Sequence, residues 1–242
     1  MALLGARLAA AAEPDAGDWA RILAARVNAA GEVAYRTLEA ADEKALERHL
    51  DTLAGVDPKK LGRDAAVAFW LNAYHALAIA AVLHGERPTI VTSRARMYHW
   101  YARKIAGQRR MLDDVRVVLN AYASVDPRIH LAIANGTRGG PRLAAVPYTA
   151  DGLDAELAAA ARRFVNDAEK NRVERAGRRV ELSRLFDWYR SDFEREAGSL
   201  QQFLAPLAAP GELREALDQT EIQVHYLPFD WRLNAAPGED PK

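Results

Sequence analysis

The residues whose types could carry out chemistry gather in one stretch of the chain, residues 126–143. An apolar run there emerges into a loop with three glycines and a proline, and such an exit from a buried element usually displays working groups. Thr137 could act in this loop as a hydroxyl nucleophile, with His130 or His75 as its general base. The backbone N–H groups of the loop would then stabilise an oxyanion, provided that base and hydroxyl lie about 3 Å apart.

Two further polar residues, Asn72 and His75, stand three positions apart in the most apolar segment, so they share one face of the expected helix. They could face a pocket, and together with Arg142 and Asp126 they are candidate ligand-binding residues. They could equally satisfy the backbone of a neighbouring loop, as buried polar groups must. We favour this second interpretation for the helical pair, because a polar side chain inside a helix more often serves structure.

The chain contains no cysteine, which excludes disulfides, a thiolate nucleophile and any cysteine-ligated metal. The histidines show no spacing typical of metal ligands, and none is followed four positions later by an Asp, a Glu or a second His. They are His49, His75, His84, His99, His130 and His225. We therefore predict neither a metal site nor a cofactor.

The balance of charge limits the classes of partner. Lys plus Arg number 33 and Asp plus Glu number 33, so the formal net charge is zero and gives no general attraction to nucleic acid or to an anionic membrane. Residues 93–110 are basic and aromatic, a mixture that can bind single-stranded nucleic acid. However, residues 101–105 and 108–112 flank Ala106 and Gly107 and predict a β-hairpin, whose charged face needs no ligand. The predicted partner is an unknown small molecule or protein, not nucleic acid.

The length of 242 residues suits one sizeable core. No internal repeat or low-complexity linker divides the chain, so residues 19–234 are predicted to form one domain. An N-terminal segment (residues 1–18) precedes it and a C-terminal tail (residues 235–242) follows. Residues 8–12, the longest apolar stretch near the start, are too short for the core of a signal peptide. We expect a cytoplasmic location, while a secreted or periplasmic one stays open if a signal peptide was removed.

The candidate residues must be positioned by the elements around them, and the most prominent element is the apolar segment of residues 65–83. Asp64 is its expected N-cap, and Gly85 with Pro88 beyond marks its end. Its 19 residues are long enough to raise the question of a membrane span. Polar groups at mid-length and the dominance of alanine favour a helix buried in the middle of a domain.

Shorter helices and hairpins surround this segment in the sequence. Periodicity and capping residues predict helices at residues 19–38 (broken at Gly31) and 42–53, from Asp113 or Asp114 to about 122, at 153–166, at 185–195 after Ser183, and from Ser199, which forms a capping box with Gln202. The first two would form a solvated outer layer. A second hairpin is predicted at residues 172–174 and 179–182 with its turn at Ala176 and Gly177, and a last strand at 222–226. This mixture, without a βαβ rhythm, predicts an α+β fold: a single mainly helical domain with a buried central helix and small antiparallel hairpins.

Five blocks of sequence resemble the family called domain of unknown function 547. They read FWLNAYHAL at residues 69–77, LDDV at 112–115, DPRIH at 126–130, LSRLFDWY at 182–189 and YLPFDW at 226–231. Their order and spacing match along most of the chain, from about residue 19 to residue 234. The biochemical role of that family is not established, so the resemblance implies a fold and a site rather than a reaction.

The chain departs from the family pattern at chemically important positions. Members typically continue after the DPRIH-like block with two cysteines and a serine between them, and those positions hold Asn135, Gly140 and Thr137 here. Members also tend to have a histidine shortly after the LDD block, where this chain has Val117. The asparagine that follows the tyrosine of the first block is His75 here.

A cysteine beside a histidine suits nucleophilic acyl chemistry, and if the family works that way this chain lacks both partners. The first hypothesis is therefore a degenerate, non-catalytic member that keeps the cleft as a ligand-binding or scaffold protein. The alternative is a hydrolase or acyl transferase that uses Thr137, His130 and Asn135 as its catalytic groups. The sequence identifies neither the ligand nor the oligomeric state.

Two Asp–Trp pairs, Asp187 with Trp188 and Asp230 with Trp231, also match family positions. A tryptophan that packs under a turn, with the aspartate accepting backbone N–H bonds, accounts for each pair structurally. We favour that interpretation over a role in binding.

Overall fold

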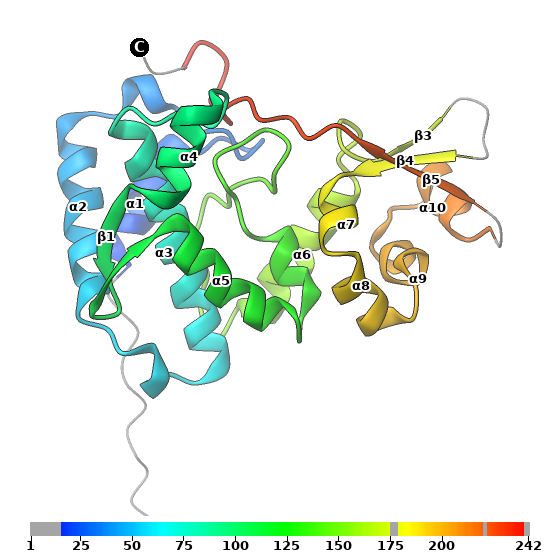
Figure 1. The fold of residues 1–242 in the computed structure, drawn as a ribbon, viewed down its shortest axis with the longest axis horizontal. Coiled ribbons are helices and arrows are strands. Elements are labelled where there is room, and N and C mark those ends of the chain that lie inside the picture. The colour runs from blue at the N-terminus through cyan, green and yellow to red at the C-terminus, as the bar shows by residue number, and fades with distance from the viewer. Residues whose placement is uncertain (1–15, 175–178, 220–221, 240–242) are drawn as a thin grey trace, which may run out of the picture.

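The fold is built around helix α3 (Arg63–Leu83), as Figure 1 shows. The computed structural model describes residues 16–174, 179–219 and 222–239. Helix α3 has the length and composition of a membrane span, but 94% of its most apolar stretch is buried inside the protein. The prediction of a buried central helix is confirmed. The predicted N-cap is wrong: Gly62 holds that position, and the Asp64 carboxylate lies in the first turn, where the helix dipole favours it.

Helices α1 (Gly17–Arg26) and α2 (Ala40–Ala54) form the layer beside α3. This layer is not merely solvated, because the inner face of α1 buries Trp19 completely. Helix α1 is also shorter than residues 19–38, since the chain turns at residues 28–32. There the Asn28 side chain accepts hydrogen bonds from the backbone N–H groups of Ala30 and Glu32, an alternative to helical pairing.

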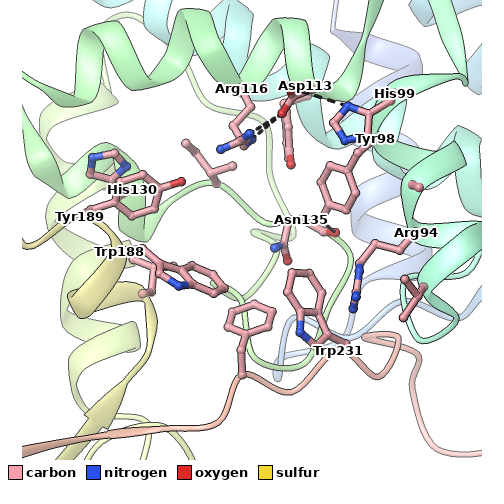
Figure 2. Close-up of a pocket in the computed structure, with 16 residues that line it drawn as sticks. Arg94, Tyr98, His99, Asp113, Arg116, His130, Asn135, Trp188, Tyr189 and Trp231 are labelled. Carbon is pink, nitrogen blue, oxygen red and sulfur yellow. Dashed lines mark hydrogen bonds and ion pairs between the residues drawn. The ribbon is translucent and has the colours of Figure 1, made fainter.

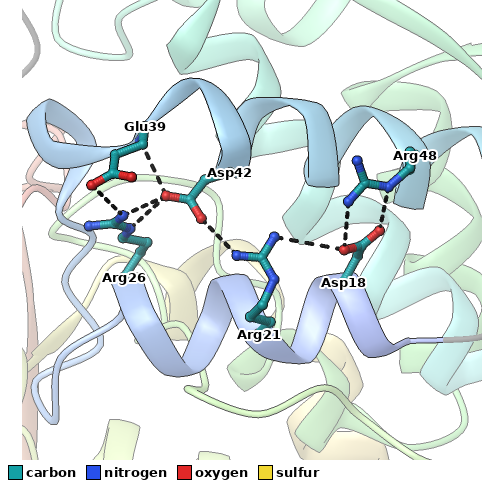
Figure 3. Close-up of polar contacts among 6 residues, drawn as sticks. All are labelled: Asp18, Arg21, Arg26, Glu39, Asp42 and Arg48. Carbon is teal, nitrogen blue, oxygen red and sulfur yellow. Dashed lines mark hydrogen bonds and ion pairs between the residues drawn. The ribbon is translucent and has the colours of Figure 1, made fainter.

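Ion pairs fasten α1 to α2 (Figure 3). The Asp42 carboxylate, on α2, accepts hydrogen bonds from Arg21 at 3.1 Å and from Arg26 at 2.6 and 2.9 Å. One of its oxygens also accepts the backbone N–H of Glu39, 3.2 Å away. Asp42 is only 3% exposed, so its charge is compensated almost entirely by protein groups.

The basic and aromatic stretch forms helix α4 (Val91–His99) and a hairpin of β1 (Ala102–Ile105) and β2 (Gln108–Met111). The predicted hairpin is confirmed, and its two-residue turn places Ala106 and Gly107 at φ 53° and 76°. Helix α5 (Leu112–Ala123) follows at once. Neither aspartate is its N-cap as predicted; Met111 is, and its N–H donates to Asp114 from 2.8 Å.

The second half of the chain adds α6 (Leu153–Val165), β3 (Arg172–Val173), β4 (Arg179–Ser183), α7 (Leu185–Trp188), α8 (Arg190–Ala197), α9 (Leu200–Leu204), α10 (Glu212–Leu217) and β5 (Gln223–Leu227). Short 310 helices lie at Tyr35–Thr37, Pro58–Lys60, Pro127–Leu131 and Ala205–Leu207. With 54% helix and 11% strand, the predicted α+β class is confirmed.

Three details of this half differ from or go beyond the sequence prediction. Strands β3 and β4 are antiparallel as predicted, but β5 joins β4 in parallel, so the second sheet is mixed. The single helix expected at residues 185–195 is two helices, because Tyr189 leaves the helical conformation with φ −115° and ψ 22°. The predicted turn at residues 176–177 lies outside the described residues, as do residues 1–15 and 240–242 of the two ends.

The buried side chains form two clusters. One surrounds α3, and the other contains β4 together with a chain of phenylalanine rings, Phe164, Phe186, Phe193 and Phe203. After β5 the chain crosses back to the first cluster (Figure 1), where Leu233 pairs with Thr137 and Ala235 with Val33. The last part of the chain thus connects the two clusters.

Candidate ligand-binding site

A cavity of about 590 Å³ lies between elements of the two clusters (Figure 2). Helices α3, α4 and α5 contribute one side, and α7 and the segment after β5 contribute the other. Aromatic side chains dominate its wall: Tyr74, Tyr98, Trp188, Tyr189, Phe229 and Trp231. A ligand there would contact residues from most of the length of the chain.

Three of these rings form a cluster on the side of the C-terminal segment. The Phe229 ring lies 4.5 Å from that of Trp231 and 5.0 Å from that of Trp188, measured between centroids. Trp188 is 48% exposed, so this cluster is not a closed core. Asp230 does accept the backbone N–H of Arg232 at 2.9 Å, as the structural interpretation expected, yet both tryptophans also line the cavity.

Charged groups from α4 and α5 also line the cavity. The Arg94 guanidinium stacks over the Trp231 ring with its carbon 4.0 Å from the centroid. Asp113 forms an ion pair with Arg116, and its other oxygen lies 3.9 Å from His99 Nδ1. Burial disfavours the charge of Arg116, but hydrogen bonds to Asp113 and Tyr189 outweigh burial and raise its pKa, so it remains a cation.

Asn135 lies in the middle of the cavity wall (Figure 2). Its Oδ1 accepts hydrogen bonds from the backbone N–H of Thr137 at 3.2 Å and from the Thr137 hydroxyl at 2.6 Å. Because a backbone N–H can only donate, Oδ1 must face Thr137, and the amide group Nδ2 must face away from it. Nδ2 donates to no acceptor among the residues that the structure describes.

The Thr137 hydroxyl forms hydrogen bonds within its own loop. It donates to Asn135 and accepts the backbone N–H of Gly140 at 3.2 Å. Thr137 is 2% exposed and does not line the aromatic cavity. Within the described part of the chain neither candidate imidazole is a hydrogen-bond partner of this hydroxyl.

His130 does line the cavity, and its partner is Asp192 on α8. The His130 Nε2 lies 2.8 Å from Asp192 Oδ2, and the ring stacks on Tyr189 with centroids 3.7 Å apart. Burial lowers the pKa of His130, so the neutral ring donates from Nε2. Burial alone would raise the pKa of Asp192, but hydrogen bonds from His130 and Arg195 lower it. His130 Nδ1 is buried and has no hydrogen-bond partner in the described ranges.

Asn72 and His75 support neighbouring loops rather than the aromatic cavity. Asn72 donates to the Tyr148 carbonyl at 2.8 Å, and its oxygen accepts the Tyr148 N–H at 3.0 Å. His75 Nε2 lies 3.1 Å from both the carbonyl of Ala132 and the N–H of Ala134, and the tautomer selects between the two. Burial lowers the pKa of His75 to about 4, so the ring is neutral near pH 7. This arrangement matches the interpretation that we favoured from the sequence.

The other two candidate ligand-binding residues also have protein partners. Arg142 donates to Asp167 at 3.0 Å and to the Ala30 carbonyl at 2.7 Å. Asp126 caps the 310 helix at Pro127–Leu131 and accepts hydrogen bonds from the backbone and the guanidinium of Arg128. Neither residue lines the aromatic cavity, so of the seven candidates this cavity brings together only His130 and Asn135.

The positions where the resembling family has cysteines are close in space. A Cβ atom added to Gly140 would overlap Asn135 Oδ1 and come within 3.1 Å of Asn135 Cγ. The Asn135 side chain therefore occupies the space that a side chain at position 140 would need. Val117, at the family's histidine position, is 60% exposed on α5 and does not line the cavity.

Several lining residues were missed as site residues by sequence reasoning. Polar groups at the cavity come from Arg94, Asp113, Arg116 and Tyr189. Asp192 does not line the cavity but accepts a hydrogen bond from His130. The signal in the sequence is the pair of family blocks at residues 182–189 and 226–231, whose aromatic residues the sequence pattern assigns to turns. No group of three or more His, Asp or Glu side chains suited to a metal occurs among the described residues.

Comparison with known proteins gives one match. The model of the family described as "Protein of unknown function, DUF547" matches residues 58–165, which include α3 to α6. No curated protein and no solved structure matches this chain. The matched range contains Arg94, Asp113 and Asn135 of the cavity, while the tryptophans of its other wall lie beyond that range.

Proposed function

We propose that this chain, which belongs through residues 58–165 to the family of proteins of unknown function DUF547, is a non-catalytic binder of a small, ring-bearing molecule. The observation that carries the proposal is the cluster of Trp188, Phe229 and Trp231 beside about 590 Å³ of open volume. Rings left partly exposed around a concave space are typical of ligand sites rather than of cores.

The dimensions and chemistry of the cavity support a small ligand. Binding pockets commonly span roughly 300–1,000 Å³ and combine an apolar wall with a few polar groups that fix orientation. Here the wall is aromatic, and Asn135 and Arg116 supply polar groups. Aromatic contacts contribute about 0.5–1.5 kcal/mol per pair beyond the area they bury, so a flat ring would gain most from this wall.

The positions of the candidate catalytic groups support a non-catalytic role. A hydroxyl nucleophile needs a base within hydrogen-bond reach, but the Thr137 hydroxyl already donates to Asn135. His130 offers no accessible lone pair, because Asp192 holds Nε2 and Nδ1 is buried. Proton transfer would require both groups to leave their present contacts.

The alternative is a hydrolase or acyl transferase that uses Thr137, His130 and Asn135. The contact between His130 and Asp192 favours it, because a carboxylate that orients an imidazole is a common arrangement in acyl transfer. An assay against peptide, amide and ester libraries separates the two functions. We expect no turnover, and turnover that Thr137→Ala or Asn135→Ala abolishes would establish the alternative.

The binding proposal can be tested with the neutral dye N-phenylnaphthylamine, whose fluorescence rises in an apolar site. Ala95 is an exposed residue of α4 that lines the cavity, so Ala95→Trp should fill the space at little cost to the fold. Ala41→Trp is the matched control, because Ala41 is exposed on α2 and lies away from the cavity. We expect one dye per chain for the wild type and the control, and a loss of affinity of about tenfold or more for Ala95→Trp. Equal affinity in all three proteins would contradict the proposal.

A further inference from the structure

We infer that the ligand is an anion, a flat ring that carries an oxyanion group, and that Arg94 recognises its charge. This inference rests on the proposed function, since it specifies the molecule that the aromatic cavity would hold. It is carried by the charges of the cavity wall and by the hydrogen-bond donors there that lack acceptors.

The charges on the side chains of the cavity wall do not sum to zero. The charged side chains are Arg94, Arg116 and Asp113, two cations and one carboxylate, and His99 and His130 add no negative charge. Asp113 forms its ion pair with Arg116, which removes one charge of each sign. The charge that remains belongs to Arg94, and in a partly enclosed space a single uncompensated cation attracts an anion.

Arg94 differs from its neighbour on the same helix. Arg96 Nε donates to both oxygens of Glu86, at 3.0 and 3.1 Å. For Arg94, in contrast, no carboxylate of the described residues lies within ion-pair distance. Its one hydrogen bond to a described residue runs from Nη1 to the Pro88 carbonyl at the long distance of 3.5 Å. A guanidinium has five N–H donors, so most of those on Arg94 are available to a ligand.

The packing of Arg94 prepares it for this role. Its guanidinium stacks on Trp231, which fixes the plane of the group without using its N–H donors. The same indole belongs to the ring cluster with Phe229 and Trp188. One molecule could therefore place a ring against the cluster and an oxyanion against Arg94 (Figure 2).

Asn135 supplies a second donor to the same space. The Thr137 contacts orient its amide so that Nδ2 is directed away from the loop, and no described residue accepts from it. A cationic ligand would meet two arginines in this cavity and one carboxylate that is already paired. The wall therefore selects against cations and offers donors rather than acceptors to a polar substituent.

Two dyes with the same rings and different charge test the inference: anionic anilinonaphthalene sulfonate and neutral N-phenylnaphthylamine. We expect the wild type to bind the sulfonate at least about tenfold more tightly, the scale of one charge-assisted contact. Arg94→Gln removes the charge at this position and should therefore abolish this preference, with a much larger loss of affinity for the sulfonate than for the neutral dye. Arg94→Lys, which keeps the charge, should retain part of the preference, and Arg96→Gln should retain all of it.

The outcomes separate the inference from the proposed function. If the wild type binds both dyes equally, or if Arg96→Gln reduces the preference as much as Arg94→Gln does, the ligand is not selected by charge at Arg94. The inference then fails while the proposed function survives. If neither dye binds in the cavity, both fail together. Thermal unfolding of each variant verifies that Arg94→Gln is folded.

Displacement of the bound sulfonate identifies the type of oxyanion. Phenylacetate and phenyl phosphate each carry one ring and one anionic group, and benzyl alcohol is the neutral control. We expect one of the two anions to displace the dye in preference to the alcohol, which assigns the site to carboxylates or to phosphates. Equal displacement by all three compounds would contradict recognition of an anion.

Discussion

The interface between α1 and α2 and the aromatic cavity use charge in opposite ways. At the interface the Asp42 carboxylate, nearly fully buried, accepts hydrogen bonds from Arg21 and Arg26 (Figure 3). At the cavity the Arg94 guanidinium lies beside open volume without a carboxylate partner among the described residues. A charge that the fold itself neutralises stabilises the fold, whereas a charge left beside open space and exposed rings is available to another molecule.

The largest expected effect concerns His75, another buried group whose hydrogen-bond partners are supplied by the fold, as those of Asp42 are. Folding lowers the pKa of His75 from 6.5 to about 4, so between these values the unfolded chain binds more protons than the folded one. Above about pH 6.5 the imidazole is neutral in both states and this titration does not affect the free energy of unfolding. As the pH drops to about 4, the free energy of unfolding falls by about 3 kcal/mol. Urea unfolding across this range should show the fall in the wild type.

His75→Asn, which introduces the residue of the resembling family, is the matched variant. An asparagine does not titrate, so the free energy of unfolding of this variant should depend much less on pH over the same interval. An unchanged pH dependence would mean that His75 is not the buried group responsible.

The next effect contrasts Asp42 with Arg94. Asp42→Ala leaves Arg26, which is mostly buried, without its main counter-charge, and should lower the free energy of unfolding by about 2–3 kcal/mol. Arg94→Gln removes a charge that pairs with no carboxylate of the described chain and loses only the contact with Trp231, so it should change stability by less than about 1 kcal/mol. Chemical denaturation measures both. If the two variants lost equal stability, the distinction between the two regions would be wrong.

A smaller effect than that of Asp42→Ala is expected at the boundary of the cavity. A methyl group at position 140 would overlap the Asn135 side chain, so Gly140→Ala should cost about 1–2 kcal/mol. Asn135→Ala removes the atoms that the methyl group would meet, and the double variant should therefore lose less stability than the sum of the single variants. A double-mutant cycle measures this coupling, expected at about 1 kcal/mol. Strict additivity would show that the two positions are not in contact.

Local pattern explains which parts of the fold the sequence predicts. The apolar run from Ala65 to Leu83 and the Ala106–Gly107 turn specify a buried helix and a hairpin, and both are present. The parallel pairing of β5 with β4 was not predictable, because it joins residues about forty positions apart with no local signal. The predicted starts of α3 and α5 are wrong because an aspartate in the first turn and an aspartate at the N-cap give similar sequence patterns.

The sequence predicts fewer residues of the site than elements of the fold, again because the missing part depends on contacts between distant segments. Polar side chains in apolar surroundings serve buried hydrogen bonds as well as catalysis, and Asn72, His75 and Thr137 make such bonds. The cavity is assembled from segments far apart in the sequence, so Arg94 and Trp231 carry no shared pattern. Only His130 and Asn135 of the original candidates reach it.

The most direct test of the central claim is a crystal structure of the protein with N-phenylnaphthylamine. We predict one dye molecule in the cavity, with a ring in contact with Trp188 and Phe229. A dye bound elsewhere, for example on the Trp100 side chain, which is 72% exposed, with the cavity free of dye, would contradict the claim.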